Sequence, residues 1–195
     1  MKIAIMTDAE GVAGVLDSPN WCRPEGRYYE VCKELLTEEV NAAIRGFRSG
    51  GFDEFHVIDG HGSGAIEIRL LDPDAEYARG WPDTWPFGLD KSFDAVAWVG
   101  QHAKAGTERA HLAHTQNFGY LDLSVNGISI GEFGQFAFCA AELGIPAIFG
   151  SGDQAFADEA QALMPGIETV AVKRGVTNGR GDECTMEQYR ARNTA

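Results

Sequence analysis

The chain has 195 residues, enough for one large domain with a real core, and its hydrophobic content of 44% is ordinary for a globular protein. Its 16 basic and 29 acidic residues give a formal net charge of −13, and the lack of any Lys or Arg run argues against nucleic acid as a partner, because such proteins neutralise phosphates with basic patches. The apolar stretch at the N-terminus is too short for a signal peptide, and no stretch approaches the ~20 apolar residues of a membrane-spanning helix, so we expect a cytoplasmic protein without a membrane partner.

The first half of the chain alternates strand and helix patterns. Residues 2–7 form a short, Ile-rich apolar run that predicts a buried strand, and residues 26–47 carry apolar side chains at helical spacing. Residues 55–59 predict a second strand. Residues 71–91 contain three prolines and three Trp or Tyr positions, so we expect an irregular excursion there.

The second half continues the alternation. Asn126-Gly127 lies between alternating apolar residues at 121–130, which predicts a hairpin. The remaining patterns predict strands at 93–100, 146–150 and 169–172, helices at 131–143 and 155–164, and the start of a helix at 186–192. Strands that alternate with helices predict an α/β fold with a largely parallel sheet covered by helices on both faces.

Several of these predicted strands are followed directly by residues that can bind a metal ion. Asp8 and Glu10 follow the first strand, His61 the second, His102 the third, and Asp153 a later one. In open α/β sheets, ligands bind in the crevice at the carboxyl ends of the strands. We therefore predict that these side chains converge there to form a metal site.

Asp8 and Glu10 are two residues apart, so both carboxylates face one side of an extended segment, where like charges are unfavourable unless a cation neutralises them. Without a metal ion, Asp8 and Glu10 would simply belong to a solvated acidic loop. His61 and His102 would likewise be ordinary loop histidines held by hydrogen bonds. Glu132 stands at a predicted helix start, where a carboxylate also suits the helix dipole. As a fifth ligand it would complete a two-metal site bridged by Asp8 that activates a water molecule.

His114 lies in a polar stretch beyond the third strand, and His111 lies three residues before it. His114 suits a general base, a nucleophile or an oxyanion stabiliser. The chain has no nucleotide-phosphate loop or GxSxG elbow after a strand, so nucleotide binding and serine-hydrolase chemistry are not expected.

Seven segments occur in an order that resembles the D-aminopeptidase family of bacterial dipeptide-utilisation operons, metallopeptidase family M55. They are MTDAEGVAG, LLTEEVNAA, IDGHGSG, VGQHAKAG, AHTQNFG, VNGISIGEFG and IFGSGD, and the likeness runs to about residue 176. The resemblance implies a zinc-dependent aminopeptidase that removes N-terminal D-amino acids from short peptides such as D-Ala-D-Ala. It implies two zinc ions, His114 as the catalytic histidine, and as metal ligands Asp8, Glu10, His61, His102 and Glu132.

The resemblance also implies a ring-like homo-oligomer. Family members continue beyond the end of this sequence, so we expect residues 1–176 to form the catalytic domain and residues 177–195 to begin a truncated C-terminal region. His114 lies one residue further from His102 than in the family pattern, which keeps His111 as the alternative catalytic residue.

Two other functions remain open. The first is a different two-metal hydrolase, an amidohydrolase or phosphoesterase, because one scaffold serves many reactions. The second is a non-catalytic, metal-stabilised peptide-binding module. Manganese or cobalt would also tolerate the mixed ligands expected for zinc.

Overall fold

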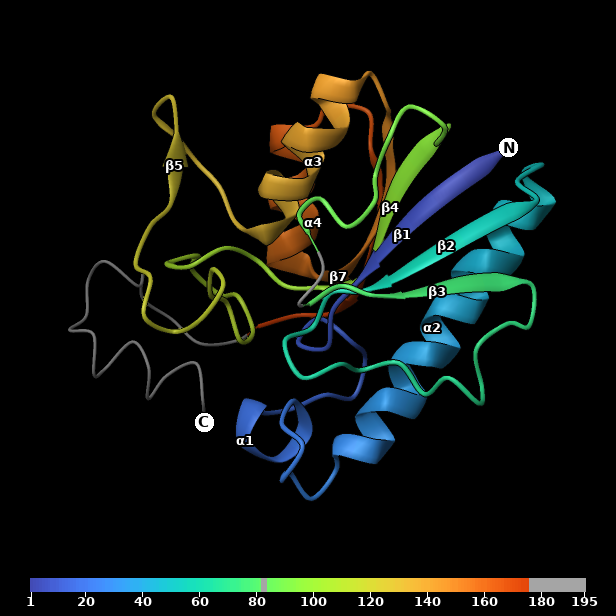
Figure 1. Cartoon of the computed structure of the whole chain (residues 1–195). Helices are drawn as coiled ribbons and strands as arrows, with labels where there is room; N and C mark the ends of the chain where they lie inside the picture. Colours follow the sequence, from blue (N-terminus) through green and yellow to red (C-terminus); the bar gives the residue numbers. More distant parts are fainter. Residues whose placement is uncertain (82–83, 176–195) are drawn as a thin grey trace.

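A single parallel sheet of six strands organises the protein, whose computed structural model describes residues 1–81 and 84–175 (Figure 1). The strand order is β3-β2-β1-β4-β7-β8. The strands are β1 (Lys2–Thr7), β2 (Glu54–Asp59), β3 (Ala75–Arg79), β4 (Ala95–Gln101), β7 (Ala147–Asp153) and β8 (Glu168–Lys173). Every pairing in this sheet is parallel, which confirms the predicted α/β fold class.

Helices cover both faces of the sheet, as Figure 1 shows. Helix α2 (Tyr29–Ser49) lies on one face, and α3 (Glu132–Leu143) and α4 (Gln154–Leu163) lie on the other. Helix α2 buries a stripe at four-residue spacing, which separates its apolar core face from its charged outer face. The stripe consists of Cys32, Leu36, Val40 and Ile44, and it belongs to one of two apolar clusters. The second cluster contains residues of α3 and α4.

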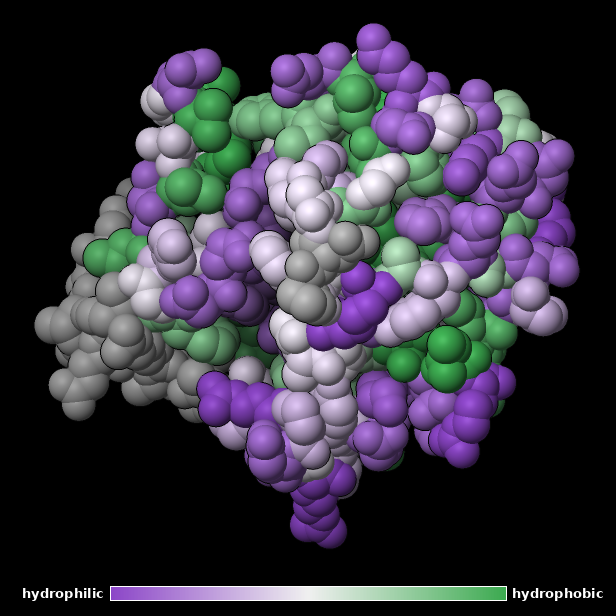
Figure 2. Space-filling view, in the orientation of Figure 1, coloured by the Kyte–Doolittle hydropathy of each residue, from purple (hydrophilic) through white to green (hydrophobic). Residues whose placement is uncertain are grey.

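A two-stranded hairpin, β5 (Ser124–Val125) and β6 (Ile128–Ser129), projects from the body of the protein. Asn126 and Gly127 at its tip both have positive φ, 52° and 81°, as a type I′ turn requires. Figure 2 shows hydrophobic residues gathered on this hairpin, where Val125 is 42% and Ile128 is 51% exposed. The predicted hairpin is therefore confirmed, and its exposed apolar side chains are available for contacts.

The irregular excursion expected at residues 71–91 is wrong in part, because β3 lies within it and pairs with β2. Strand β3 is an edge strand with half-buried residues, and its sequence, AEYAR, has no β-branched residue that would mark a strand. The sequence pattern also missed the short helix α1 (Ser18–Trp21), whose cap is Asp17. The helix start expected at residues 186–192 lies outside the described residues.

The part of the chain that the structure describes contains no helix long and apolar enough to cross a membrane.

Candidate metal centre and active site

Six side chains that the sequence singled out meet at the carboxyl ends of the central strands. Asp8 and Glu10 come from the segment after β1, and His61 comes from the segment after β2. His102 follows β4 directly, and Glu132 is the first residue of α3. These residues and His114 form two groups that could each hold a metal ion, with ligand atoms within 4.8 Å of one another: Asp8, Glu10 and His61, and His102, His114 and Glu132.

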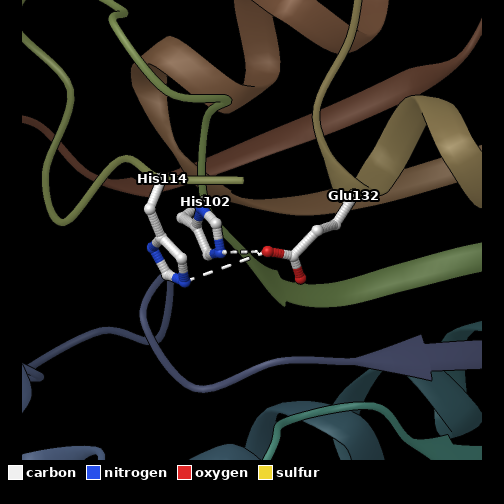
Figure 3. A group of neighbouring side chains, drawn as sticks. All are labelled: His102, His114 and Glu132. Atoms are coloured by element: carbon white, nitrogen blue, oxygen red, sulfur yellow. Dashed lines mark ion pairs between the residues drawn. The ribbon is translucent and has the colours of Figure 1, made fainter. Parts of the chain in front are cut away.

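Glu132 faces two histidines in the second group, as Figure 3 shows. Its Oε1 atom lies 3.7 Å from Nε2 of His102 and 3.8 Å from Nε2 of His114. The two imidazole rings stack with centroids 3.9 Å apart and an interplanar angle of 14°. The stacking directs both Nε2 atoms toward one carboxylate.

Asp8 connects the two groups. Its Oδ2 atom lies 3.2 Å from Nε2 of His102, which belongs to the second group. Within the first group, Oε1 of Glu10 lies 3.5 Å from Nε2 of His61. Two ligand atoms on one tetrahedral zinc ion are roughly 3.4 Å apart, given Zn–N and Zn–O bonds of about 2.0–2.2 Å. The separations of 3.2–3.8 Å at this site therefore fit donors that share a metal ion.

The hydrogen bonds of two histidines show why these donors need a cation. Nδ1 of His102 lies 2.9 Å from the carbonyl oxygen of Ala103, and Nδ1 of His114 lies 2.8 Å from that of Leu112. A carbonyl oxygen only accepts, so both Nδ1 atoms donate and both neutral rings keep a lone pair on Nε2. These lone pairs face carboxylate oxygens, which also only accept. Among the described residues, Nε2 of His102 and Oε2 of Glu10 are buried without a hydrogen-bond partner.

Protons can also supply positive charge at such a site. The pKa values of the buried carboxyl and imidazole groups show how strongly these groups affect one another. Burial and the neighbouring Glu10 raise the pKa of Asp8 to about 7. Burial opposes ionisation of Glu10, yet the adjacent His61 holds the pKa of Glu10 well below its usual value. Burial disfavours the charged form of His61, but Glu10 raises its pKa to about 9. The carboxylates therefore require compensating positive charge, from protons or from metal ions.

His114 differs electrostatically from the other histidines. Burial opposes protonation of His102, yet Asp8 raises the pKa of His102 well above 6.5, so without a metal ion this ring takes up a proton. Burial, and then the charge of the protonated His102, lower the pKa of His114 from 6.5, which favours the neutral ring at neutral pH. His111, its alternative, lies elsewhere: its Nε2 atom is 2.9 Å from the carbonyl oxygen of Leu16. The structure therefore places His114, and not His111, beside His102 and Glu132.

Asp153 does not join the candidate metal ligands, although it too lies at a strand end, as the last residue of β7. It is fully buried at the N-terminus of α4, where Oδ1 accepts a hydrogen bond from the backbone N–H of Phe156. Its Oδ2 atom accepts one from the backbone N–H of His111. Its role is to cap a helix and to hold a loop, so the strand-end pattern was wrong as a sign of metal binding here.

Two residues that the sequence reasoning missed hold the candidate ligands in place. Nε2 of Gln101 donates to Oδ2 of Asp8 at 3.1 Å, and its position directly before His102 was the only available signal. Glu159, on α4, accepts a hydrogen bond from the backbone N–H of Lys104 at 2.8 Å. No sequence pattern connects Glu159 with the strand ends, because its contact depends on the packing of α4.

Glycines let the strand ends approach closely. A Cβ atom at Gly11 would lie 2.0 Å from the carbonyl oxygen of Gln101, and one at Gly152 would lie 1.8 Å from the same atom. Both positions therefore require glycine. Gly11 lies within a turn, which the hydrogen bond from the N–H of Val12 to the carbonyl oxygen of Ala9 closes at 3.2 Å.

Comparison with known proteins shows to which family the chain belongs. The family model described as Peptidase_M55, D-aminopeptidase, matches residues 1–194. The chain belongs to the M55 D-aminopeptidase family. Within this family, the chain is 31% identical over 182 residues to a D-aminopeptidase of Bacillus subtilis (strain 168), an alignment that covers 91% of this chain and 65% of the relative. The chain thus spans just under two thirds of that relative's length.

A solved M55 structure has the same fold. It is the zinc-dependent D-aminopeptidase DppA from Bacillus subtilis, described as a self-compartmentalizing protease. It matches with a TM-score of 0.85 and 27% sequence identity, over all of this chain and 71% of that one. The predicted family resemblance is confirmed.

Proposed function

We propose that this protein is a zinc-dependent aminopeptidase that removes N-terminal D-amino acids from short peptides. The observation that supports this most directly is the set of imidazole nitrogens and carboxylate oxygens at the strand ends, which lie 3.2–3.8 Å from one another. The donors are imidazole nitrogens and carboxylate oxygens, which suit zinc. The zinc dependence and the D-aminopeptidase activity of the solved relative point the same way.

Two ions would be held by the five residues Asp8, Glu10, His61, His102 and Glu132, with Asp8 between them. When bound, the ions supply a water molecule of lowered pKa and polarise the scissile carbonyl. The carboxylates of the site also neutralise the free α-amino group of the substrate. This pairing favours peptides with an unblocked N-terminus over blocked ones.

His114 is the proposed proton carrier. Because its Nδ1 atom donates to Leu112, its Nε2 atom is free to accept a proton from the attacking water. The same nitrogen then returns the proton to the departing amine as the peptide C–N bond breaks. The geometry also offers His114 a second role as a ligand, because it lies within reach of Glu132 and His102.

We further propose that the protein forms a homo-oligomer. The solved relative is a self-compartmentalizing protease, and the projecting β5–β6 hairpin here exposes Val125 and Ile128. Apolar side chains on a two-stranded projection gain stability when a second copy covers them.

The test is zinc content measured by plasma mass spectrometry, together with hydrolysis of D-Ala-D-Ala, L-Ala-L-Ala and a phosphomonoester. About two zinc per chain with turnover of the D-peptide alone supports the proposal. No uptake of zinc, or turnover of the phosphoester alone, would refute it. A D8A variant should lose zinc, whereas R27A, which removes an exposed charge outside the site, should keep it.

A further inference from the structure

A cavity of about 240 Å³ opens beside the candidate metal ligands. Ligand pockets for drug-sized molecules run to roughly 300–1,000 Å³, so this cavity suits a smaller ligand. One part of its wall consists of carboxylates and histidines, including Asp8, Glu10 and His61. Trp81 and Phe118 add aromatic surface. The cavity is thus small, and its lining combines several carboxylates with aromatic surface.

Arg23 is the one lysine or arginine that lines this cavity in the described part of the chain. It is exposed, and within residues 1–81 and 84–175 no ion pair or hydrogen-bond acceptor is found for its guanidinium group. Its charge is therefore not engaged by a carboxylate of the described structure. The net charge of −13 makes an uncompensated cation beside an acidic site unusual.

The backbone around Arg23 is well anchored. Cys22, directly before it, is buried and lines the same cavity. The carbonyl oxygen of Arg23 accepts a hydrogen bond from the N–H of Gly26 at 2.8 Å. A Cβ atom at Gly26 would lie 2.4 Å from the carbonyl oxygen of Asn20, so this turn packs closely. Arg23 therefore starts from a fixed point on the cavity wall.

We propose that Arg23 binds the C-terminal carboxylate of the substrate, and that the site therefore prefers short peptides with a free C-terminus over amidated ones. This inference rests on the proposed peptidase function. The guanidinium group forms paired, charge-assisted hydrogen bonds with a carboxylate, a geometry that lysine cannot reproduce. The carboxylates of the same lining take the amino group, so a short peptide pairs both of its charged ends within one cavity.

The size of the cavity sets the length of the peptide. An extended chain spans about 3.3–3.6 Å per residue, or roughly 7 Å for a dipeptide and 10 Å for a tripeptide. We expect a peptide too long for this cavity to place its carboxylate outside it, away from Arg23. Its activity would then lack the contribution of this residue.

The experiment compares D-Ala-D-Ala with its C-terminal amide in the wild type, R23M, R23K and R27M. Arg27 is a matched control, because it lies four residues away, its guanidinium group is over the ring of Tyr28 and it does not line the cavity. We expect the wild type to favour the free acid by about 10- to 100-fold in kcat/KM, the range expected for a charge-assisted hydrogen bond. In R23M that preference should disappear through a higher KM for the acid, while the amide reacts as in the wild type.

R23K should recover part of the preference, and R27M should keep all of it. Equal hydrolysis of acid and amide by the wild type, or an equal loss on both substrates in R23M with normal zinc content, would overturn the role of Arg23. Failure of the wild type to hydrolyse either compound would instead refute the peptidase function itself.

Discussion

Glu159 offers a test of how the fold holds the candidate metal centre, because it contacts the segments beside the candidate ligands and none of those ligands. One carboxylate oxygen accepts the backbone N–H of Lys104, two residues after His102. The other is buried near Gly131, where a Cβ atom would lie 3.2 Å from it, directly before Glu132. We infer that Glu159 holds together the two segments that present His102 and Glu132.

The E159A variant should leave the Lys104 N–H without its partner, whereas E159Q keeps an acceptor of the same shape. A buried N–H without a partner costs about 1–3 kcal/mol. For a chain of this length each kcal/mol lowers the melting temperature by roughly 2–4 °C, so E159A should melt about 2–12 °C below the wild type. Loss of a residue that orients metal ligands also weakens metal affinity by roughly 10- to 100-fold.

The assay is calorimetric melting at fixed protein concentration, with zinc affinity measured by competition against a chelating dye. We expect E159A to have a lower melting temperature and a lower zinc affinity than the wild type, and E159Q to resemble the wild type in both. If E159A matched the wild type in melting and in zinc affinity, or if E159Q were as damaged as E159A, the hydrogen bond to Lys104 would not be the relevant interaction.

Comparison of E159Q with the wild type also predicts how stability depends on pH. Burial raises the pKa of Glu159 above its ordinary value of 4.5. The stability associated with this carboxyl is therefore fully present below the unfolded pKa and is lost as the pH rises through the raised folded pKa. Glutamine does not ionise, so the melting temperature of E159Q relative to the wild type should be higher at pH 7.5 than at pH 5. An unchanged difference would argue against a raised pKa.

Three further predictions follow from the described contacts. H114A should abolish turnover of D-Ala-D-Ala while about two zinc per chain remain, and a loss of one zinc would identify His114 as a ligand instead. V125D with I128D should reduce the assembly size seen by light scattering without lowering the zinc content, and an unchanged size would remove the hairpin from the interface. G152A should cost about 1–3 kcal/mol or more in chemical denaturation, because its Cβ atom would lie 1.8 Å from a backbone oxygen, whereas G46A, with no atom within 4 Å of its Cβ, should be stabilising.

The sequence by itself determined the class of fold and most of its elements. Short apolar runs separated by helical periodicity are properties of neighbouring residues, and β1 and the hairpin at Asn126-Gly127 were predicted from them correctly. The strand-end pattern named four of the six side chains that meet at the candidate centre, Asp8, Glu10, His61 and His102, because a parallel sheet brings the carboxyl ends of its strands to one edge. Glu132 was predicted at a helix start, and His114 in the polar stretch beyond the third strand.

Tertiary structure decided what each strand-end residue contacts. Asp153 ends β7 and Asp8 directly follows β1, yet Asp153 caps α4 and Asp8 connects the two groups of candidate ligands. The difference depends on which helix packs beside each strand end. This helix–strand contact cannot be predicted from the residues next to Asp8 or Asp153 in the sequence. The same reason explains why β3 was missed: an edge strand is stabilised by its pairing with β2 and not by its own residues. The contacts of Glu159 and the position of Arg23 on the cavity wall likewise arise only when distant segments pack together.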